Sequence, residues 1–386
     1  MTSSLSSFRR TLQIPLKKHN AFFLWGPRKV GKTTLLHQQF PQAKYYDLLN
    51  TELKTKLLLN PSLLREELLA DPQDVIVIDE VQKVPPLLDE IHWLLENTPM
   101  KFILCGSSAR KLRHGAANLL GGRAWRYELF PLTTQEIENV DLHRALNHGL
   151  IPQHYLARRS EKSLKSYVLD YLSQEIQAEA LTRNIPSFAR FLEAVALTHG
   201  SLINYANIAR DCGVSSKTVR EYYQILEDTL LGHTLPPWRK RKSRRLIETA
   251  KFYLFDVGVV RALTGMHLIQ SGTEEFGRFF EHFLIEEIRA YLSYEEKDLP
   301  LHFWRTSTGL EVDLIVGDME VAIEFKASAK TDSRDLKNLK ALREEQKVKK
   351  TLLVSLDAQG RKTSDGIDIL SWKIFCDKLW SGKIVE

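Results

Sequence analysis

One loop constrains the fold of this chain more than any other feature. It lies between an apolar run and a helical pattern in AFFLWGPRKVGKTTLLHQQF, and it matches GxxxxGK[ST]. In such a loop backbone N–H groups converge on phosphates, and glycine is needed where a Cβ would clash. The helix that follows adds its dipole, Lys32 reaches the terminal phosphates and Thr33 offers a hydroxyl to Mg²⁺. A chance match in a turn is the alternative, which the flanking strand and helix patterns disfavour. The residues predicted to contact the nucleotide here are Gly26, Pro27, Arg28, Lys29, Val30, Gly31, Lys32, Thr33 and Thr34.

A second motif follows in DVIVIDEVQKVP, where a β-branched run ends in Asp79 and Glu80. Such a run is typical of a buried parallel strand, whose carboxyl end is where α/β sites lie. We expect Asp79 to hold Mg²⁺ through water and Glu80 to polarise the attacking water. An acidic turn without function is the alternative. The adjacent acids favour ATP hydrolysis over binding alone, and the chain has no NKxD motif for guanine.

The next stretches supply two further candidates. KFILCGSSARKL reads as a strand with Ser107 at its end, where a hydroxyl can sense the γ-phosphate, although a turn residue is the simpler reading. In GGRAWRYELF, Arg123 or Arg126 can reach the γ-phosphate of a neighbouring subunit and stabilise transition-state charge. We favour Arg123 over Arg126 and over a plain surface cation, and we therefore expect a homo-oligomer.

These phrases, continued by LINYANIARDCGVSSKTVREYYQILEDTLLG, KFYLFDVGVVRALTG and FWRTSTGLEVDLIV, resemble a group of prokaryotic predicted AAA+ ATPases with a C-terminal domain of unknown function. The resemblance covers most of the chain. It implies an α/β multidomain protein: an AAA+ P-loop NTPase core, a helical lid, a winged helix and a PD-(D/E)XK nuclease-like α/β domain. The expected boundaries are residues 1–132, 133–184, 185–268 and 269–386.

The predicted winged helix consists of a helix–turn–helix over residues 204–231 and two strands that flank a basic tip. Such a domain can lay its second helix in a major groove and contact phosphates with its wing. A packing unit with a solvated tip, or an adaptor that recruits other proteins, is the alternative. The residues predicted to contact nucleic acid are Lys217, Arg220, Arg239, Lys240, Arg241, Lys242, Arg244 and Arg245.

The C-terminal part reads as a helix, three short strands, a helix and a strand. Alternation places Glu324 and Lys326 on one face of the third strand, and Asp313 on the second strand can approach them. Two carboxylates suit a hard divalent ion, Mg²⁺ or Mn²⁺, with Glu281 as a further ligand, and Lys326 would stabilise charge during phosphodiester cleavage. The alternative is an ordinary cross-strand salt bridge.

Composition limits the class of protein. The 386 residues carry a net charge of +6, 43% hydrophobic residues and three well-separated cysteines, which fits a globular protein that tolerates an anionic partner. The N-terminus does not read as a signal peptide and no run is long enough to span a membrane, so we expect a cytoplasmic protein without membrane contact. The overall prediction is an ATP- and Mg²⁺-dependent ATPase whose turnover moves a winged helix and a nuclease-like domain on nucleic acid. A switch that grips nucleic acid or a protein without cutting is the alternative.

Overall fold

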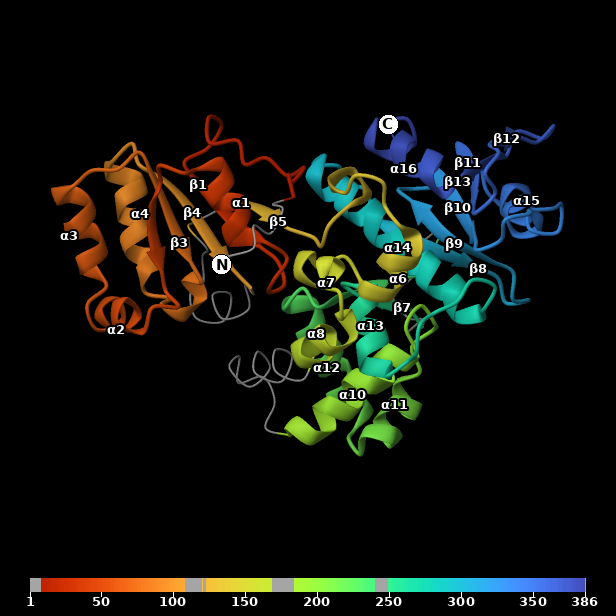
Figure 1. The fold of residues 1–386 in the computed structure, drawn as a ribbon, viewed down its shortest axis with the longest axis horizontal. Helices are drawn as coiled ribbons and strands as arrows, with labels where there is room; N and C mark the ends of the chain where they lie inside the picture. The colour runs from red at the N-terminus through yellow and green to blue at the C-terminus, as the bar shows by residue number, and fades with distance from the viewer. Residues whose placement is uncertain (1–7, 108–119, 121–122, 169–183, 240–248, 386) are drawn as a thin grey trace. The chain divides into compact units, whose positions relative to one another are not determined.

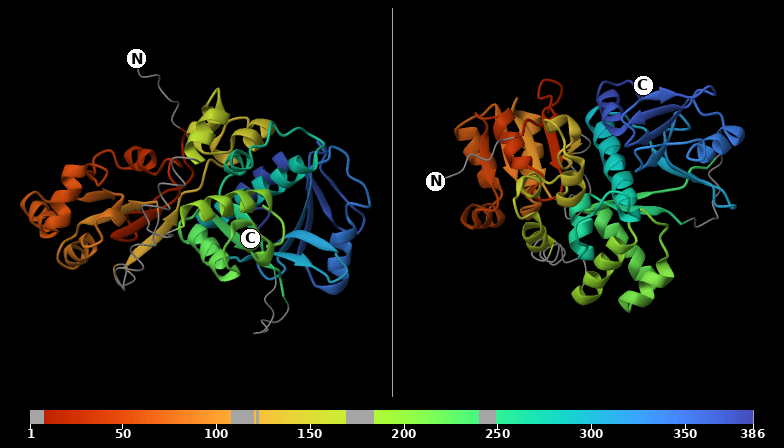
Figure 2. Two further views of the ribbon diagram at one scale, coloured as in Figure 1. Left: turned by 90° about the horizontal axis from the view of Figure 1, so that it is seen from below. Right: turned by 45° about the vertical axis from the view of Figure 1, so that its right-hand side comes forward.

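The computed structural model describes residues 8–107, 120, 123–168, 184–239 and 249–385. The chain divides into two compact units. The first comprises residues 1–132 and 225–231, and the second comprises residues 133–224 and 232–386. The elements of both units can be followed in Figures 1 and 2.

The first unit is built on a sheet of five strands in the order β2-β3-β4-β1-β5. Every neighbouring pair is parallel. Apolar runs form the central strands because both faces of such a sheet are covered, and all five residues of β1 are buried. The strands are β1 (Ala21–Trp25), β2 (Lys44–Asp47), β3 (Val75–Asp79), β4 (Lys101–Gly106) and β5 (Ala124–Glu128).

Helices cover this sheet and bury their apolar faces against it. Phe23, Ile78 and Leu104 of the strands form one buried cluster with Ile91 and Leu94 of α4. The helices are α1 (Lys32–Gln39), α2 (Thr51–Leu59), α3 (Ser62–Ala70), the 3₁₀ turn η1 (Val81–Lys83) and α4 (Leu87–Asn97). Because β4 lies between β1 and β3, the loops after these three strands meet at one carboxyl edge.

The second unit begins with helices and a hairpin. Gly213, with φ 66°, ends α11 in a left-handed conformation, and β6 pairs antiparallel with β7. The predicted helix–turn–helix and its two following strands are therefore present, and the tip between the strands lies outside the described residues. The elements are η3 (Thr134–Glu136), α6 (Leu142–His148), α7 (Pro152–Leu156), α8 (Ser160–Ser166), α10 (Ile185–Leu197), α11 (Tyr205–Cys212), α12 (Ser216–Asp228, of which residues up to 224 belong to this unit), β6 (Gly232–Leu235), β7 (Lys251–Leu254) and α13 (Val257–Thr264).

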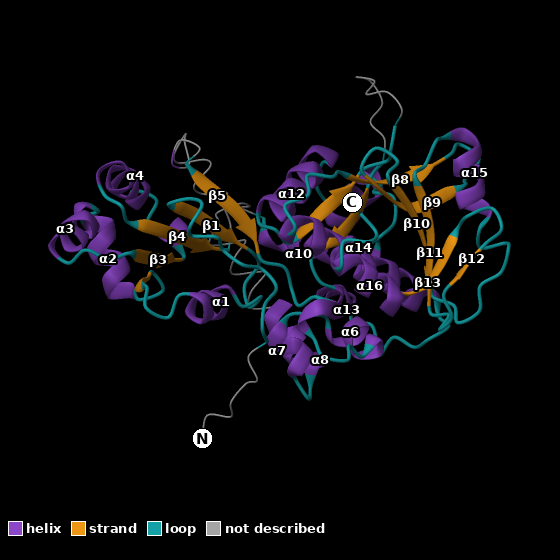
Figure 3. Ribbon diagram, turned by 90° about the horizontal axis from the view of Figure 1, so that it is seen from above, coloured by secondary structure: helices purple, strands orange, loops and turns teal. Residues whose placement is uncertain are grey.

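A mixed sheet of six strands completes the second unit, in the order β12-β13-β11-β10-β9-β8. Helix α15 covers one side, where Leu339 and Leu342 join a buried cluster with Ala322 and Leu353, and α14 and α16 lie on the other side (Figure 3). The predicted order of helix, three strands, helix and strand is present. The elements are α14 (Glu274–Tyr294), β8 (Leu301–Arg305), β9 (Glu311–Val316), β10 (Val321–Lys326), α15 (Lys337–Glu345), β11 (Lys350–Ser355), β12 (Arg361–Lys362), β13 (Asp368–Ser371) and α16 (Trp372–Trp380).

Candidate nucleotide site and acidic cluster

The predicted phosphate loop connects the end of β1 to the start of α1. Gly31 has φ 100°, and a Cβ at Gly26 would lie 2.5 Å from the carbonyl oxygen of Leu129, so both positions require glycine. The Lys32 ammonium is buried and donates to the carbonyl oxygens of Gly26 (2.7 Å) and Pro27 (3.0 Å). The loop therefore folds around the lysine that the motif assigns to the terminal phosphates.

The predicted acid pair lies beside this loop. Thr33 Oγ1 donates to Asp79 Oδ2 at 2.6 Å, so the two groups expected to hold Mg²⁺ are already in contact. Asp79 Oδ1 accepts from the backbone N–H of Glu80 at 3.0 Å. A hydroxyl and a carboxylate side by side are hard oxygen ligands that fit Mg²⁺ together with phosphate oxygens.

Glu80 is buried and is held by a residue that the sequence analysis missed. Gln82 Nε2 donates to the Glu80 carboxylate, and it also lies 3.1 Å from Ser107 Oγ, which follows β4. One carboxamide thus connects the expected catalytic acid with the expected γ-phosphate sensor. The DEVQ phrase contains this glutamine two residues after Glu80, but its contact with Ser107 depends on β4 lying next to β3.

Arg123 contacts helix α4. Its guanidinium pairs with Glu96 (2.8 Å) and lies 3.1 Å from His92 Nε2, both on α4, and half of its side chain is exposed. The arrangement leaves its expected role toward a neighbouring subunit as a prediction.

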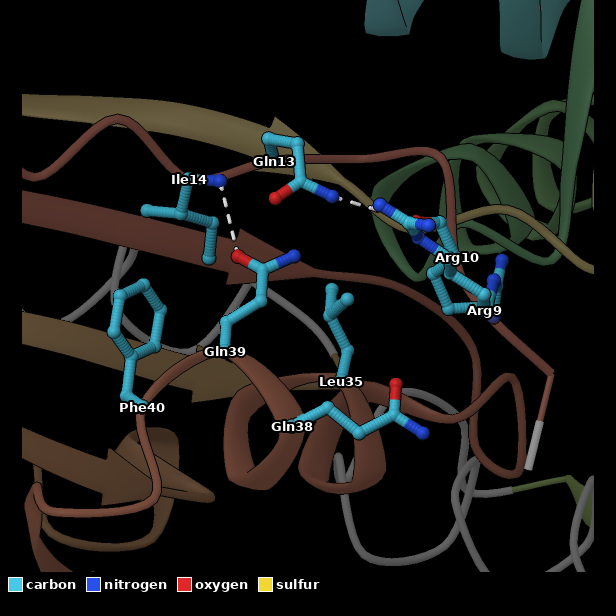
Figure 4. Close-up of a pocket in the computed structure, with 8 residues that line it drawn as sticks. All are labelled: Arg9, Arg10, Gln13, Ile14, Leu35, Gln38, Gln39 and Phe40. Carbon is cyan, nitrogen blue, oxygen red and sulfur yellow. Dashed lines mark hydrogen bonds between the residues drawn. The ribbon is translucent and has the colours of Figure 1, made fainter.

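A pocket of about 350 Å³ lies next to the phosphate loop, between the N-terminal segment and α1 (Figure 4). Arg10, which lines it, donates to the carbonyl oxygens of Val30 (2.5 Å) and Phe130 (2.7 Å) and so binds the segment to the loop. Gln39 fixes the segment further, since its amide bonds to Leu12 O and Ile14 N. The lining residues are Arg9, Arg10, Gln13, Ile14, Leu35, Gln38, Gln39 and Phe40.

The second unit holds a group of carboxylates that we call the acidic cluster: Glu281 of α14, Glu311 and Asp313 of β9, and Glu324 of β10. Glu324 Oε1 accepts from Lys326 Nζ at 2.7 Å and from Asn338 Nδ2 at 3.2 Å. Asp313 Oδ2 accepts from the backbone N–H of Phe325 at 2.8 Å, which holds β9 against β10 at this point. The structure thus brings Asp313, Glu324 and Lys326 together as the alternation implied.

Glu281 joins the same cluster through partners that were not predicted. Its Oε1 accepts from Tyr253 OH at 2.6 Å and lies 3.3 Å from Lys251 Nζ. Lys251 Nζ also lies 2.7 Å from Glu311. The two partners of Glu281, Tyr253 and Lys251, both belong to β7. A lysine in the apolar strand KFYLFD was a readable signal, because lysine is almost never fully buried unless it is paired.

The electrostatics of the acidic cluster are set by burial and by like charges. Burial, together with the charges of Glu324 and Glu281, raises the pKa of Asp313 well above its usual value. Burial also raises the pKa of Glu324, although Lys326 opposes the shift. Within the described ranges, no group of three or more His, Cys, Asp or Glu is arranged to hold a metal ion. As it stands, the cluster therefore does not fit the predicted divalent ion.

The predicted nucleic-acid contacts are only partly described. Lys217 and Arg220 are exposed on α12, and the Arg220 guanidinium lies 3.9 Å from the ring centroid of Tyr205. Arg239 is partly exposed at the end of the described segment after β6. Five predicted contacts lie outside the described residues: Lys240, Arg241, Lys242, Arg244 and Arg245.

Three family models match consecutive parts of the chain, and the match in the first unit agrees with its phosphate loop. Residues 18–138 match a family model described as an AAA domain, residues 139–269 match a domain of unknown function (DUF8612), and residues 276–375 match another (DUF4143). Residues 18–138 are therefore similar to AAA domains, in agreement with the phosphate-loop geometry, and the C-terminal part is similar to DUF4143 domains. The DUF8612 match runs through both the predicted lid and the predicted winged helix.

Two relatives and two solved structures resemble the chain. The uncharacterized proteins Rv2008c of Mycobacterium tuberculosis and Mb2031c of Mycobacterium bovis are each 29% identical over 315 residues, covering 79% of this chain and 69% of theirs. The Walker-type ATPase PABY2304 of Pyrococcus abyssi is 14% identical, with 64% of this chain and 92% of that chain covered and a TM-score of 0.45. The Aeropyrum pernix ORC1 protein in complex with DNA is 14% identical, with 64% of this chain and 87% of that chain covered and a TM-score of 0.29. Among the described helices, none combines the length and apolar character that crossing a bilayer requires.

Proposed function

We propose that this protein binds and hydrolyses ATP at the loop of residues 26–34 and uses turnover to reposition its C-terminal region on nucleic acid. The observation that carries the ATPase is the contact between Thr33 and Asp79, with Glu80 next to it at the same sheet edge. The AAA-domain match over residues 18–138 supports the same activity.

Each residue of this site has a task in the proposed reaction. Lys32 exchanges its two loop carbonyls for the terminal phosphates, and Thr33 and Asp79 would hold Mg²⁺. That ion would neutralise the charge of the phosphates. Glu80 orients and polarises the attacking water, and Ser107 reports on the γ-phosphate through Gln82.

The pocket beside the loop is the proposed place of the base. Phe40 is partly exposed and offers apolar surface to a flat ring, Ile14 and Leu35 are buried in the lining, and Gln13 and Gln38 offer amide donors and acceptors. Arg10, which lines this pocket (Figure 4), also donates to the carbonyl oxygen of Val30 in the loop, so the base and the phosphates would bind next to each other.

Nucleic acid is the proposed partner of the second unit. The helix–turn–helix of α11 and α12, followed by the β6–β7 hairpin, supports a winged helix. Lys217, Arg239 and the basic residues that follow Arg239 in the sequence offer phosphate contacts. The order α14, β8, β9, β10, α15, β11 supports a PD-(D/E)XK nuclease-like region.

The ATPase is tested with two variants of the full chain. Lys32→Ala should weaken ATP binding because the cation facing the terminal phosphates is lost. Glu80→Gln should bind ATP normally and release no phosphate, because only the water-polarising carboxylate changes. Lys44→Ala and Glu66→Gln, both at exposed residues outside the loop motifs, are matched controls. Native-rate phosphate release by Glu80→Gln would contradict the proposal.

A second candidate is an ATP-dependent switch whose nuclease-like region binds nucleic acid without cutting it. The observation that favours it is that Lys251 and Lys326 already pair with the carboxylates of the acidic cluster. Native protein incubated with ATP, Mg²⁺ and labelled DNA distinguishes the two candidates. Phosphate release with nicking supports the cutting enzyme, and phosphate release with salt-sensitive DNA binding but no nicking supports the switch.

A further inference from the structure

The acidic cluster contains a buried cation that comes from outside the nuclease-like elements. Lys251 is the first residue of β7, and only 5% of its side chain is exposed. Its Nζ contacts Glu281 at 3.3 Å and Glu311 at 2.7 Å, and Asp313 attracts it electrostatically. One ammonium group thus pairs with two carboxylates, Glu281 and Glu311, and attracts a third, Asp313.

These contacts surround the buried ammonium with carboxylates, which is the pairing that a buried lysine requires. The backbone of Lys251 is fixed by pairing with Leu235 and by a bridge to Leu202. Its charge can therefore leave the cluster only by a swing of the side chain.

A second observation shows that the cluster has unused ligand capacity. Glu324 is only 1% exposed, and its Oε2 is buried with no hydrogen-bond partner among the described residues. Buried carboxylate oxygens without a donor are costly, and a hard cation is the group that best satisfies them. The carboxylates are the right donor type for Mg²⁺ or Mn²⁺, although they are not arranged to hold one.

We propose that the Lys251 ammonium is the resident counter-cation of the acidic cluster and competes with a divalent ion for it. In the native protein this ammonium takes the place of the predicted divalent ion, and the carboxylates around it are not arranged to hold Mg²⁺ or Mn²⁺. The inference rests on the proposed nuclease-like function, because it says why the acidic cluster of that region does not take up a divalent ion, and it is independent of ATP hydrolysis.

The test is a Mn²⁺ titration of the full chain without nucleotide, with free Mn²⁺ followed by electron paramagnetic resonance. Every protein carries Asp79→Asn, so that the ion site of the phosphate loop is not counted. Lys251→Met should bind one Mn²⁺ at least about tenfold more tightly than the parent, because a unit positive charge a few ångströms away is removed. Lys251→Arg keeps the charge and should bind as weakly as the parent. Adding Glu324→Gln to Lys251→Met should abolish the gained site.

Two results would overturn the proposal. One is equal Mn²⁺ affinity with and without Lys251→Met. The other is tight binding by the parent that Glu324→Gln removes, which would mean that the lysine does not compete. If Lys251→Met unfolds without metal, Mn²⁺ must restore its folded circular dichroism spectrum, and failure to do so also counts against the proposal. Phosphate release by the protein with native Asp79 is scored separately, so a failed ATPase and a failed metal site remain distinguishable.

Discussion

The backbone of Glu80 adopts a conformation that few non-glycine residues accept. Its φ is 58°, in the left-handed region, which costs on the order of 1 kcal/mol for such a residue. In this conformation the carboxylate accepts a hydrogen bond from Gln82 Nε2, and Ser107 Oγ lies 3.1 Å from the same nitrogen. Gln82 is therefore a positioning residue for the acid that is expected to polarise water.

This geometry predicts a separation of binding from turnover. Gln82→Ala should lower kcat by about tenfold to a hundredfold, since a displaced catalytic group loses its alignment, while the Kd for ATP stays unchanged. Gln82→Glu, which brings a like charge toward Glu80, should be slower still. The measurements are phosphate release under saturating ATP and fluorescent-nucleotide binding, with Gln73→Ala, at a partly exposed glutamine, as the control. A native kcat in Gln82→Ala would show that Glu80 needs no such support.

At the scale of elements, one buried acid connects three parts of the second unit. Glu287 of α14 accepts from the backbone N–H of Thr134 at 2.9 Å and from Trp380 Nε1 of α16 at 2.6 Å, and the Thr134 hydroxyl also contacts it. Burial raises the pKa of Glu287 to about 7, even though these hydrogen bonds oppose the shift.

The raised pKa makes the stability of this junction depend on pH. The folded protein keeps the Glu287 proton up to about pH 7, whereas the unfolded chain loses it near its usual pKa, so stability falls as pH rises between the two values. Glu287→Gln removes this loss. The variant should gain up to about 3 kcal/mol of unfolding free energy relative to native at pH 8, and little or nothing at pH 4.

Urea denaturation at both pH values, followed by tryptophan fluorescence because Trp380 touches the site, measures the difference. The exposed substitution Glu344→Gln is the control. A gain that is the same at pH 4 and pH 8 would show that Glu287 does not titrate in this range.

Local spacing made several of these elements predictable. The loop around Lys32, the acids after β3 and the alternating pair Glu324 and Lys326 all follow from residues close together in the chain. Gln82 and Lys251 were not predicted as site residues, because their partners are brought to them by strand neighbours and helix packing that no short pattern encodes. The basic tip after Arg239 stays a prediction, since it lies outside the described residues.

At the scale of the whole molecule, the role of Arg123 decides whether turnover needs more than one copy of the chain. Arg123 is tied to Glu96 within its own unit, but half-exposed ion pairs are worth only about 1 kcal/mol or less, so this arginine is available to another copy of the chain. If it acts on the γ-phosphate of a neighbour, turnover requires at least two chains.

Arg123→Ala should therefore bind ATP normally and hydrolyse it slowly. Mixing it with Glu80→Gln should restore part of the activity, because some mixed interfaces contain both an intact arginine and an intact acid. Arg65→Ala is the control, because Arg65 also pairs with an acid of α4, Glu90. This variant should hydrolyse ATP at the native rate without a mixing partner. Full native activity at dilutions where the protein is strictly monomeric would exclude a role in trans.

The pairing of Lys251 with Glu281 and Glu311 also bears on how such a chain can be inherited. The lysine lies in the segment that matches DUF8612, and the acids lie in the segment that matches DUF4143. A recombination event that joined these segments from different ancestors would leave buried charges without their partners. Removing one partner of a buried ion pair costs about 3–5 kcal/mol. The two segments should therefore pass through lineages as one unit, and exchange of ATPase domains should be tolerated best at a joint near residue 132, upstream of both.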